Sequence, residues 1–134
     1  MIGVVVATHG RLAEELVRTA EGVVGTLARV KPLGVVASAP DAQQQVDRAI
    51  DEMEEGEGVL VLTDLFGGSP TNLCLPCLAS RHVEVLTGVN LPMLLKLGSL
   101  RKPGVDLEQL AKGLADAARQ GIALLSEKLR ERRA

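Results

Sequence analysis

Two residues that can take part in chemistry follow short apolar runs of the chain. His9 comes after the run 2–7, and Asp64 comes after the run 59–62. A carboxylate that accepts a hydrogen bond from one imidazole nitrogen fixes the tautomer and leaves the other nitrogen free as a nucleophile. It also stabilises positive charge that develops on the ring during attack. The pair predicts a histidine nucleophile that Asp64 orients.

A glycine-rich segment after Asp64 predicts a place for an anion. Gly67, Gly68 and Ser69 precede an expected helix, where backbone amides point at bound anions and glycine allows close approach. Thr8 and Gly10 flank His9 and complete the expected phosphate-binding set. Attack of His9 on a phosphoryl donor at this place requires no metal ion and no cofactor. The same residue types also occur in ordinary turns, which is the simpler interpretation.

The remaining elements predict how these residues are positioned. Apolar runs alternate with segments of helical periodicity, which predicts a doubly wound α/β fold: a mainly parallel four-stranded sheet with helices on both faces. In such sheets, ligands bind at the carboxyl ends of the strands. We expect strands at 2–7, 30–36, 59–62 and 83–87, and helices at 11–24, from Pro40 to before Gly56, at 70–79 with Ser69 as N-cap, after 88–92, and from Asp106.

Size and composition restrict the possible functions. The chain of 134 residues fits a single domain, 1–134, and its hydrophobic content of 46% is that of a folded protein. A formal net charge of −2 and the absence of Trp and Tyr argue against nucleic acid as a partner. Two cysteines without an apparent signal peptide predict a cytoplasmic protein.

Three segments give the chain a recognisable pattern. They are Ala7-Thr8-His9-Gly10, the stretch from Thr63 to Asn72 that reads TDLFGGSPTN, and the stretch from Gly88 to Leu94 that reads GVNLPML. In order and separation they resemble the enzyme IIA component of the mannose family of the bacterial phosphoenolpyruvate:sugar phosphotransferase system. The resemblance covers about residues 1–120, and the second segment is the most specific.

The resemblance implies a role for each matching position. His9 matches the phosphorylated histidine, Asp64 its partner carboxylate, and Ser69 a hydroxyl near the phosphoryl oxygens. Members of the family have a doubly wound parallel sheet. They receive phosphate from the histidine-containing phosphocarrier protein and pass it to a IIB component that serves a membrane permease. Phe66 stands where a Trp is common, a mild change of packing, and Arg11 is either a solvated side chain or a contact to phosphate or partner.

The C-terminal segment 122–129 has two interpretations. Helix propensity favours a helix that continues after Gly121. The resemblance implies instead a homodimer, in some relatives formed by exchange of an antiparallel C-terminal edge strand. The arginines that follow are expected to form a solvated basic tail.

Cys74 and Cys77 are expected to be structural, and His82 is expected to lie at the surface. The Cys-x-x-Cys spacing falls inside an expected helix, where small apolar residues pack against the sheet. Zinc would need further ligands, and His82 is the only other histidine.

Four functions compete for this pattern. The first is a stand-alone IIA phosphocarrier for sugar uptake, and the second is a regulatory phosphocarrier that moves no sugar. The third is the phosphoryl donor subunit of a dihydroxyacetone kinase, although the segment 66–70 fits the sugar branch better. The fourth is a flavodoxin-like binding module, for which loss of His9 would have no effect.

Overall fold

The computed structural model of the chain describes residues 1–133 and contains one parallel sheet. Its strands are β1 (Gly3–His9), β2 (Val30–Val35), β3 (Val59–Thr63) and β4 (Val83–Thr87), in the order β2-β1-β3-β4. β1 pairs with both β2 and β3, and β3 pairs with β4, all in parallel. The predicted four-stranded parallel α/β fold is therefore confirmed.

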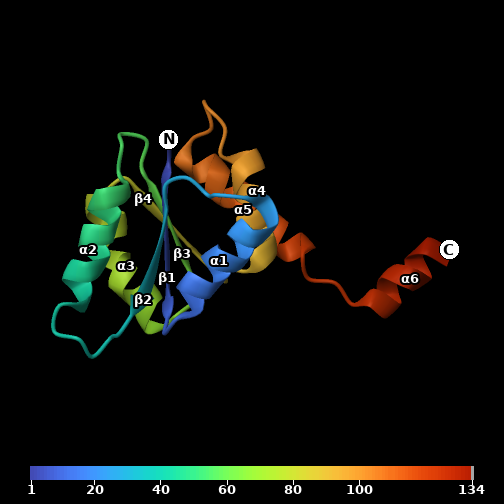
Figure 1. The fold of residues 1–134 in the computed structure, drawn as a ribbon, viewed down its shortest axis with the longest axis horizontal. Helices are drawn as coiled ribbons and strands as arrows, with labels where there is room; N and C mark the ends of the chain where they lie inside the picture. The colour runs from blue at the N-terminus through green and yellow to red at the C-terminus, as the bar shows by residue number, and fades with distance from the viewer. Residues whose placement is uncertain (134) are drawn as a thin grey trace.

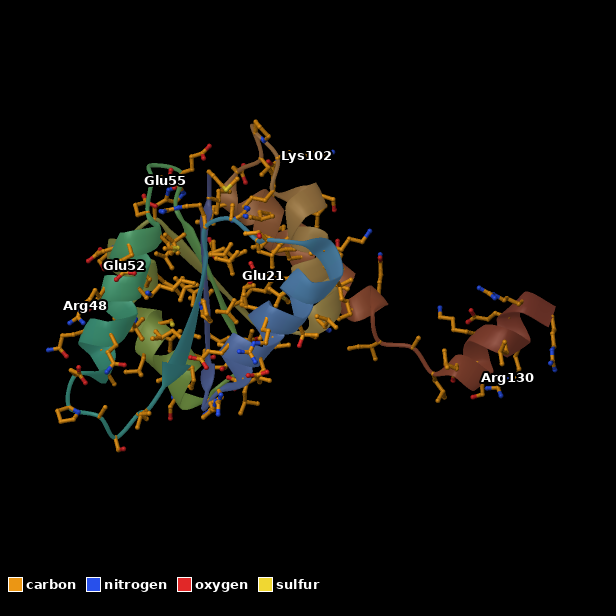
Figure 2. The ribbon with its side chains drawn as sticks, viewed as in Figure 1. Glu21, Arg48, Glu52, Glu55, Lys102 and Arg130 are labelled. Atoms are coloured by element: carbon orange, nitrogen blue, oxygen red, sulfur yellow. The ribbon has the colours of Figure 1, made fainter. Side chains whose placement is uncertain are left out.

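Helices cover both faces of the sheet (Figure 1). α2 (Ala42–Met53) and α3 (Ser69–Ser80) lie on one face, and α1 (Leu12–Val24), α4 (Leu91–Leu100) and α5 (Leu107–Gln120) lie on the other. α6 (Leu125–Arg133) extends away from this body. Charged residues lie on the outside, among them Arg48 and Glu52 on α2 and Arg130 on α6 (Figure 2). Among residues 1–133, no helix has the length and apolar character to cross a membrane.

The alternation of side chains along the strands divides the core into two layers. Val4 and Val6 of β1 pack on the side of α1, α4 and α5, whereas Val5 and Ala7 pack on the side of α2 and α3. β3 alternates in the same way. Such continuous apolar strands are what a parallel sheet buried on both faces requires. The core is therefore complete around the two central strands, which carry His9 and Asp64 at their ends.

The two edges of the sheet differ. Pro32 lies in the edge strand β2 and has no backbone N–H to offer an added strand. β4 forms the opposite edge, contains no proline, and leaves Val85, Leu86 and Thr87 only half-buried. Within residues 1–133, β4 has β3 as its one strand neighbour.

Three expected boundaries need correction. α3 begins at Ser69 with Gly68 as its N-cap, so Ser69 is the first helical residue rather than the cap. α2 begins at Ala42, two residues after Pro40. The helix expected over 122–129 begins only at Leu125, after three non-helical residues, and it ends at Arg133; an exchanged edge strand in a dimer stays a prediction.

Gly34 lets the strand β2 lie close to the loop after β1. A Cβ atom on Gly34 would lie 2.4 Å from the carbonyl oxygen of Gly10, a backbone atom that cannot move aside alone. Gly34→Ala should therefore lower the free energy of unfolding by about 1–3 kcal/mol through overpacking. Chemical denaturation measures the change.

Gly22→Ala is the matched control, because this substitution should raise the free energy of unfolding. Gly22 lies in α1 with open space where the alanine side chain would stand, and alanine in a helix is favoured over glycine by up to about 1 kcal/mol. Equal effects of Gly34→Ala and Gly22→Ala would contradict the steric explanation.

Candidate active site

His9 and Asp64 meet at the carboxyl edge of the sheet. β1 and β3 are adjacent and parallel, with Ala7 opposite Thr63, so both chains leave the sheet at the same level. Oδ2 of Asp64 accepts a hydrogen bond from the backbone N–H of His9 at 3.0 Å. The same oxygen lies 2.9 Å from Nδ1 of the imidazole. The expected juxtaposition of His9 and Asp64 is present in the structure.

The charge of Asp64 determines which imidazole nitrogen is free. Burial opposes ionisation of Asp64, but the hydrogen bonds and charge of His9 outweigh it and place the Asp64 pKa below its ordinary value of 3.8. An ionised carboxylate only accepts hydrogen bonds, so Nδ1 carries the hydrogen. Nε2 is then the nitrogen with the free lone pair.

The exposure of the pair suits a reaction at the protein surface. The His9 side chain is 51% exposed, whereas that of Asp64 is 13% exposed. Oδ1 of Asp64 is buried and has no hydrogen-bond partner among residues 1–133. The imidazole is therefore held from beneath by one oxygen and is open to an approaching molecule on its other side.

Gly68 packs directly against the imidazole. A Cβ atom at this position would lie 2.9 Å from Cε1 of His9, so only glycine leaves the ring its present place. Gly67 has a φ of +79°, a conformation that favours glycine. Together they lead into α3, whose first-turn amides have no partner within the helix.

Ser69 stands at the start of α3, half-buried, and its hydroxyl makes no hydrogen bond to residues 1–133. It is therefore free to donate to a bound anion. Gly10 turns the chain after His9 with a φ of +53°, and it is exposed.

Thr8 is the one expected phosphate contact whose side chain faces inward. It is fully buried, and its hydroxyl accepts from the backbone N–H of Ala13 at 2.7 Å and donates to the carbonyl oxygen of His9 at 3.1 Å. Its single hydrogen is used inside the fold. This placement favours a role in holding the His9 loop rather than contact with phosphate.

The segment from Gly88 to Leu94, which follows β4, contacts the end of β3 beside the site. The N–H of Val89 donates to the carbonyl oxygen of Thr63 at 2.9 Å, just before Asp64. Asn90 caps α4 by accepting from the N–H of Met93 at 3.1 Å, and its amide donates to the carbonyl of Ala118 at the same distance. The segment therefore links α4 and α5 to the end of β3.

Two side chains at the rim are exposed. Phe66 is 84% exposed, so the expected change of packing has little effect within one chain. The Arg11 side chain is 82% exposed, and its Nε lies 4.0 Å from Glu14, a weak surface pair.

The cysteines lie in the core, as expected. Cys74 and Cys77 are buried on the sheet side of α3, and burial together with Cys77 and Asp47 raises the pKa of Cys74 to about 12. The Cys74 thiol is therefore not a nucleophile near neutral pH. His82 is exposed, and residues 1–133 contain no group of three or more side chains suited to hold a metal ion.

Gly34 and two threonines were not among the expected site residues. A lone glycine inside an apolar strand indicates close backbone approach, which is the signal that identifies Gly34. A polar residue ending an otherwise apolar strand is the signal for Thr63, whose hydroxyl bonds to that of Thr71 at 2.7 Å.

Known proteins are similar to this chain in sequence. A family model described as "PTS system fructose IIA component" (EIIA-man) matches residues 3–115. The Escherichia coli (strain K12) PTS system mannose-specific EIIAB component is 31% identical over 130 residues, which are 95% of this chain and 40% of that protein. The chain thus spans less than half the length of that relative.

Solved structures of IIA proteins have a similar fold. A PTS IIA protein associated with the fucose utilization operon of Streptococcus pneumoniae is 31% identical, with a TM-score of 0.79 and 95% of each chain covered. The mannose/sorbose-specific IIA subunit from Enterococcus faecalis is 25% identical, also with a TM-score of 0.79, over 92% of this chain and 93% of that chain. From its sequence and fold, the chain belongs to the EIIA-man family of IIA components of the phosphoenolpyruvate:sugar phosphotransferase system.

Proposed function

We propose that His9 accepts a phosphoryl group from the histidine-containing phosphocarrier protein and passes it to a IIB component, for uptake of a sugar through a membrane permease. The observation that carries this proposal is the contact of Asp64 with Nδ1 of His9, which leaves Nε2 free at the surface. A half-exposed nucleophile suits exchange between two protein surfaces.

The proposed transfer balances without a further reactant. The lone pair of Nε2 attacks phosphorus, and a P–N bond forms as the bond between phosphorus and the donor's imidazole nitrogen breaks. The donor nitrogen leaves with the bonding electrons, so its ring becomes neutral while the His9 ring gains positive charge. Asp64 stabilises that charge through the Nδ1–H hydrogen bond. The reverse sequence of bonds delivers the group to the IIB component.

The loop between Asp64 and α3 supplies the expected anion site. Gly68 contacts the edge of the imidazole, and the α3 amides and the Ser69 hydroxyl begin directly after it. Amides at a helix start and a partly positive helix terminus stabilise phosphoryl oxygens. This arrangement supports Gly67, Gly68 and Ser69 as the residues that bind the phosphoryl group. Gly10 then forms the turn that leaves space for that group.

The carrier chemistry predicts one labile phosphate on His9. After incubation with phosphoenolpyruvate, enzyme I and the phosphocarrier protein, intact mass without acid should show one added phosphate that is lost in acid. His9→Ala should remain unlabelled, whereas His82→Ala, which changes the other histidine, should label as the wild type does.

Asp64→Asn tests the orienting role in the same assay, because an amide cannot supply the negative charge. Its labelling should be slower by roughly ten- to a hundred-fold, because the His9 imidazole is then held less accurately for attack. An unlabelled wild type, with donors that are active on another acceptor, would leave the binding module as the better function.

The ion pair also predicts a titration. The Asp64 carboxyl carbon, followed by NMR, should titrate below 3.8 in the wild type and at a higher pH in His9→Ala, because burial then lacks its main counterweight. A lowered folded-state pKa stabilises the fold above the unfolded pKa of about 3.9, and this stabilisation is lost as the pH falls through the folded value. His82→Ala should not move the Asp64 titration; an unchanged titration in His9→Ala would contradict the pairing.

A homodimer is the second part of the proposal. α6 buries no residue, and the apolar side chains of the C-terminal segment are exposed, at 77% for Ile122, 62% for Leu124, 71% for Leu125 and 53% for Leu129. A cluster of this kind marks an interaction site. The edge strand β4 is where we expect the C-terminal segment of a second copy to bind.

Light scattering should therefore give twice the 14.1 kDa of one chain. Leu124→Ser with Leu125→Ser should shift the equilibrium toward monomer, because buried apolar contacts are lost. Val23→Ser changes a residue on α1 that is 63% exposed and should leave the mass unchanged. A wild-type monomer at all concentrations would refute the dimer and leave the carrier chemistry intact.

A further inference from the structure

The buried polar side chains of residues 1–133 gather at one place. They are Thr8, Thr63 and Thr71, which are 0%, 0% and 4% exposed. Thr8 and Thr63 immediately precede His9 and Asp64, and Thr71 lies in the first turn of α3. Elsewhere the core is apolar. A buried hydroxyl is costly unless it is hydrogen-bonded, so this concentration of threonines at the site needs a reason beyond packing.

The Thr63–Thr71 pair fixes the backbone beside Asp64. The Thr71 hydroxyl donates to the carbonyl oxygen of Leu65 at 2.7 Å, which uses its single hydrogen. Thr63 therefore donates to Thr71 across the 2.7 Å contact between the two hydroxyl oxygens. This chain of two bonds ties the end of β3 and the residue after Asp64 to α3.

Thr8 fixes the backbone beside His9 in the same manner. Its hydroxyl joins the N–H of Ala13, in the first turn of α1, to the carbonyl oxygen of His9. The end of β1 at His9 and the chain that follows β3 at Asp64 are thus each held from inside by hydroxyl groups. The contact of 2.9 Å between Nδ1 and Oδ2 depends on both loops at once.

Stability alone does not require the Thr63–Thr71 hydroxyl pair. Valine has nearly the same shape, and replacing both hydroxyls by apolar groups can be nearly neutral for folding, because the carbonyl oxygen of Leu65 still accepts from the N–H of Gly68 at 3.3 Å. Val and Leu fill the rest of β3. The hydroxyls are then better explained by the backbone geometry that their hydrogen bonds fix beside His9 and Asp64.

We propose that Thr8, Thr63 and Thr71 are positioning residues, which hold the backbone of the two loops and thereby set the separation of His9 and Asp64. The effect on transfer rests on the proposed phosphocarrier function. The effect on the pair itself does not, because the imidazole can be observed without a donor.

The double variant Thr63→Val with Thr71→Val is the main test. We expect a folded protein whose labelling by phosphoenolpyruvate, enzyme I and the phosphocarrier protein is slower by about ten-fold or more, since small displacements of reacting groups are costly. The ¹⁵N spectrum of the His9 imidazole should show a smaller population with hydrogen on Nδ1. Thr71→Ser keeps the hydroxyl and should label and resonate as the wild type does.

Thr87→Val is the matched control. Thr87 ends β4 at the level of Thr63, is half-buried, and makes no side-chain hydrogen bond to residues 1–133. Its replacement should change neither the labelling rate nor the ¹⁵N spectrum.

The outcomes separate this proposal from the proposed function. A folded double variant with wild-type labelling and a wild-type ¹⁵N spectrum overturns the positioning role. If the wild type itself is not labelled, the carrier function fails, and the ¹⁵N spectrum alone decides the positioning role. If the double variant does not fold, Thr8 decides: slow labelling of Thr8→Val together with normal labelling of Thr8→Ser supports the proposal, and equal rates overturn it.

Discussion

The parallel pairing of β1 with β3 is the constraint on which the site depends. It brings Ala7 opposite Thr63, so that the residues one or two positions later meet above the sheet edge. The register matters for packing as well, because a shift of one strand by one residue would exchange the side chains that it presents to the two core layers. The apolar layers on both sides therefore hold the Nδ1–Oδ2 contact of His9 and Asp64 in place.

Hydrogen bonding then gives the His9 imidazole a defined orientation. Asp64 uses one oxygen for both the backbone and the ring of His9, which fixes the imidazole in rotation as well as in tautomer. Gly68 limits the ring on its Cε1 edge, and the His9 side chain as a whole is half-exposed. His9 is the last residue of β1 and Asp64 directly follows β3, so both candidate site residues lie where strands end, as is common in α/β proteins.

Sequence patterns predicted the strands, the helix order and the His9–Asp64 pair, because apolar periodicity and glycine-rich turns are local signals. They did not predict that Thr8 points inward, since the strand pattern contains no information on which hydroxyl meets the N–H of Ala13. They placed the α3 cap one residue late, because a glycine without a capping side chain is required beside the imidazole. A glycine inside the apolar run 30–36 indicates close backbone approach at Gly34, but only the fold shows that the approaching atom is the carbonyl oxygen of Gly10.

The unequal edges of the sheet bear on how copies of the chain can associate. Pro32 removes a donor from the β2 edge, so strand addition is disfavoured there, whereas β4 contains no proline and has no second strand neighbour within residues 1–133. If two copies pair through their β4 strands, the β4 edges become buried in the dimer. Only the β2 edges, which contain Pro32, then remain at the outside. In such a dimer, growth by edge pairing would stop at two copies, and the proline-containing edge would oppose open-ended polymerisation into fibres.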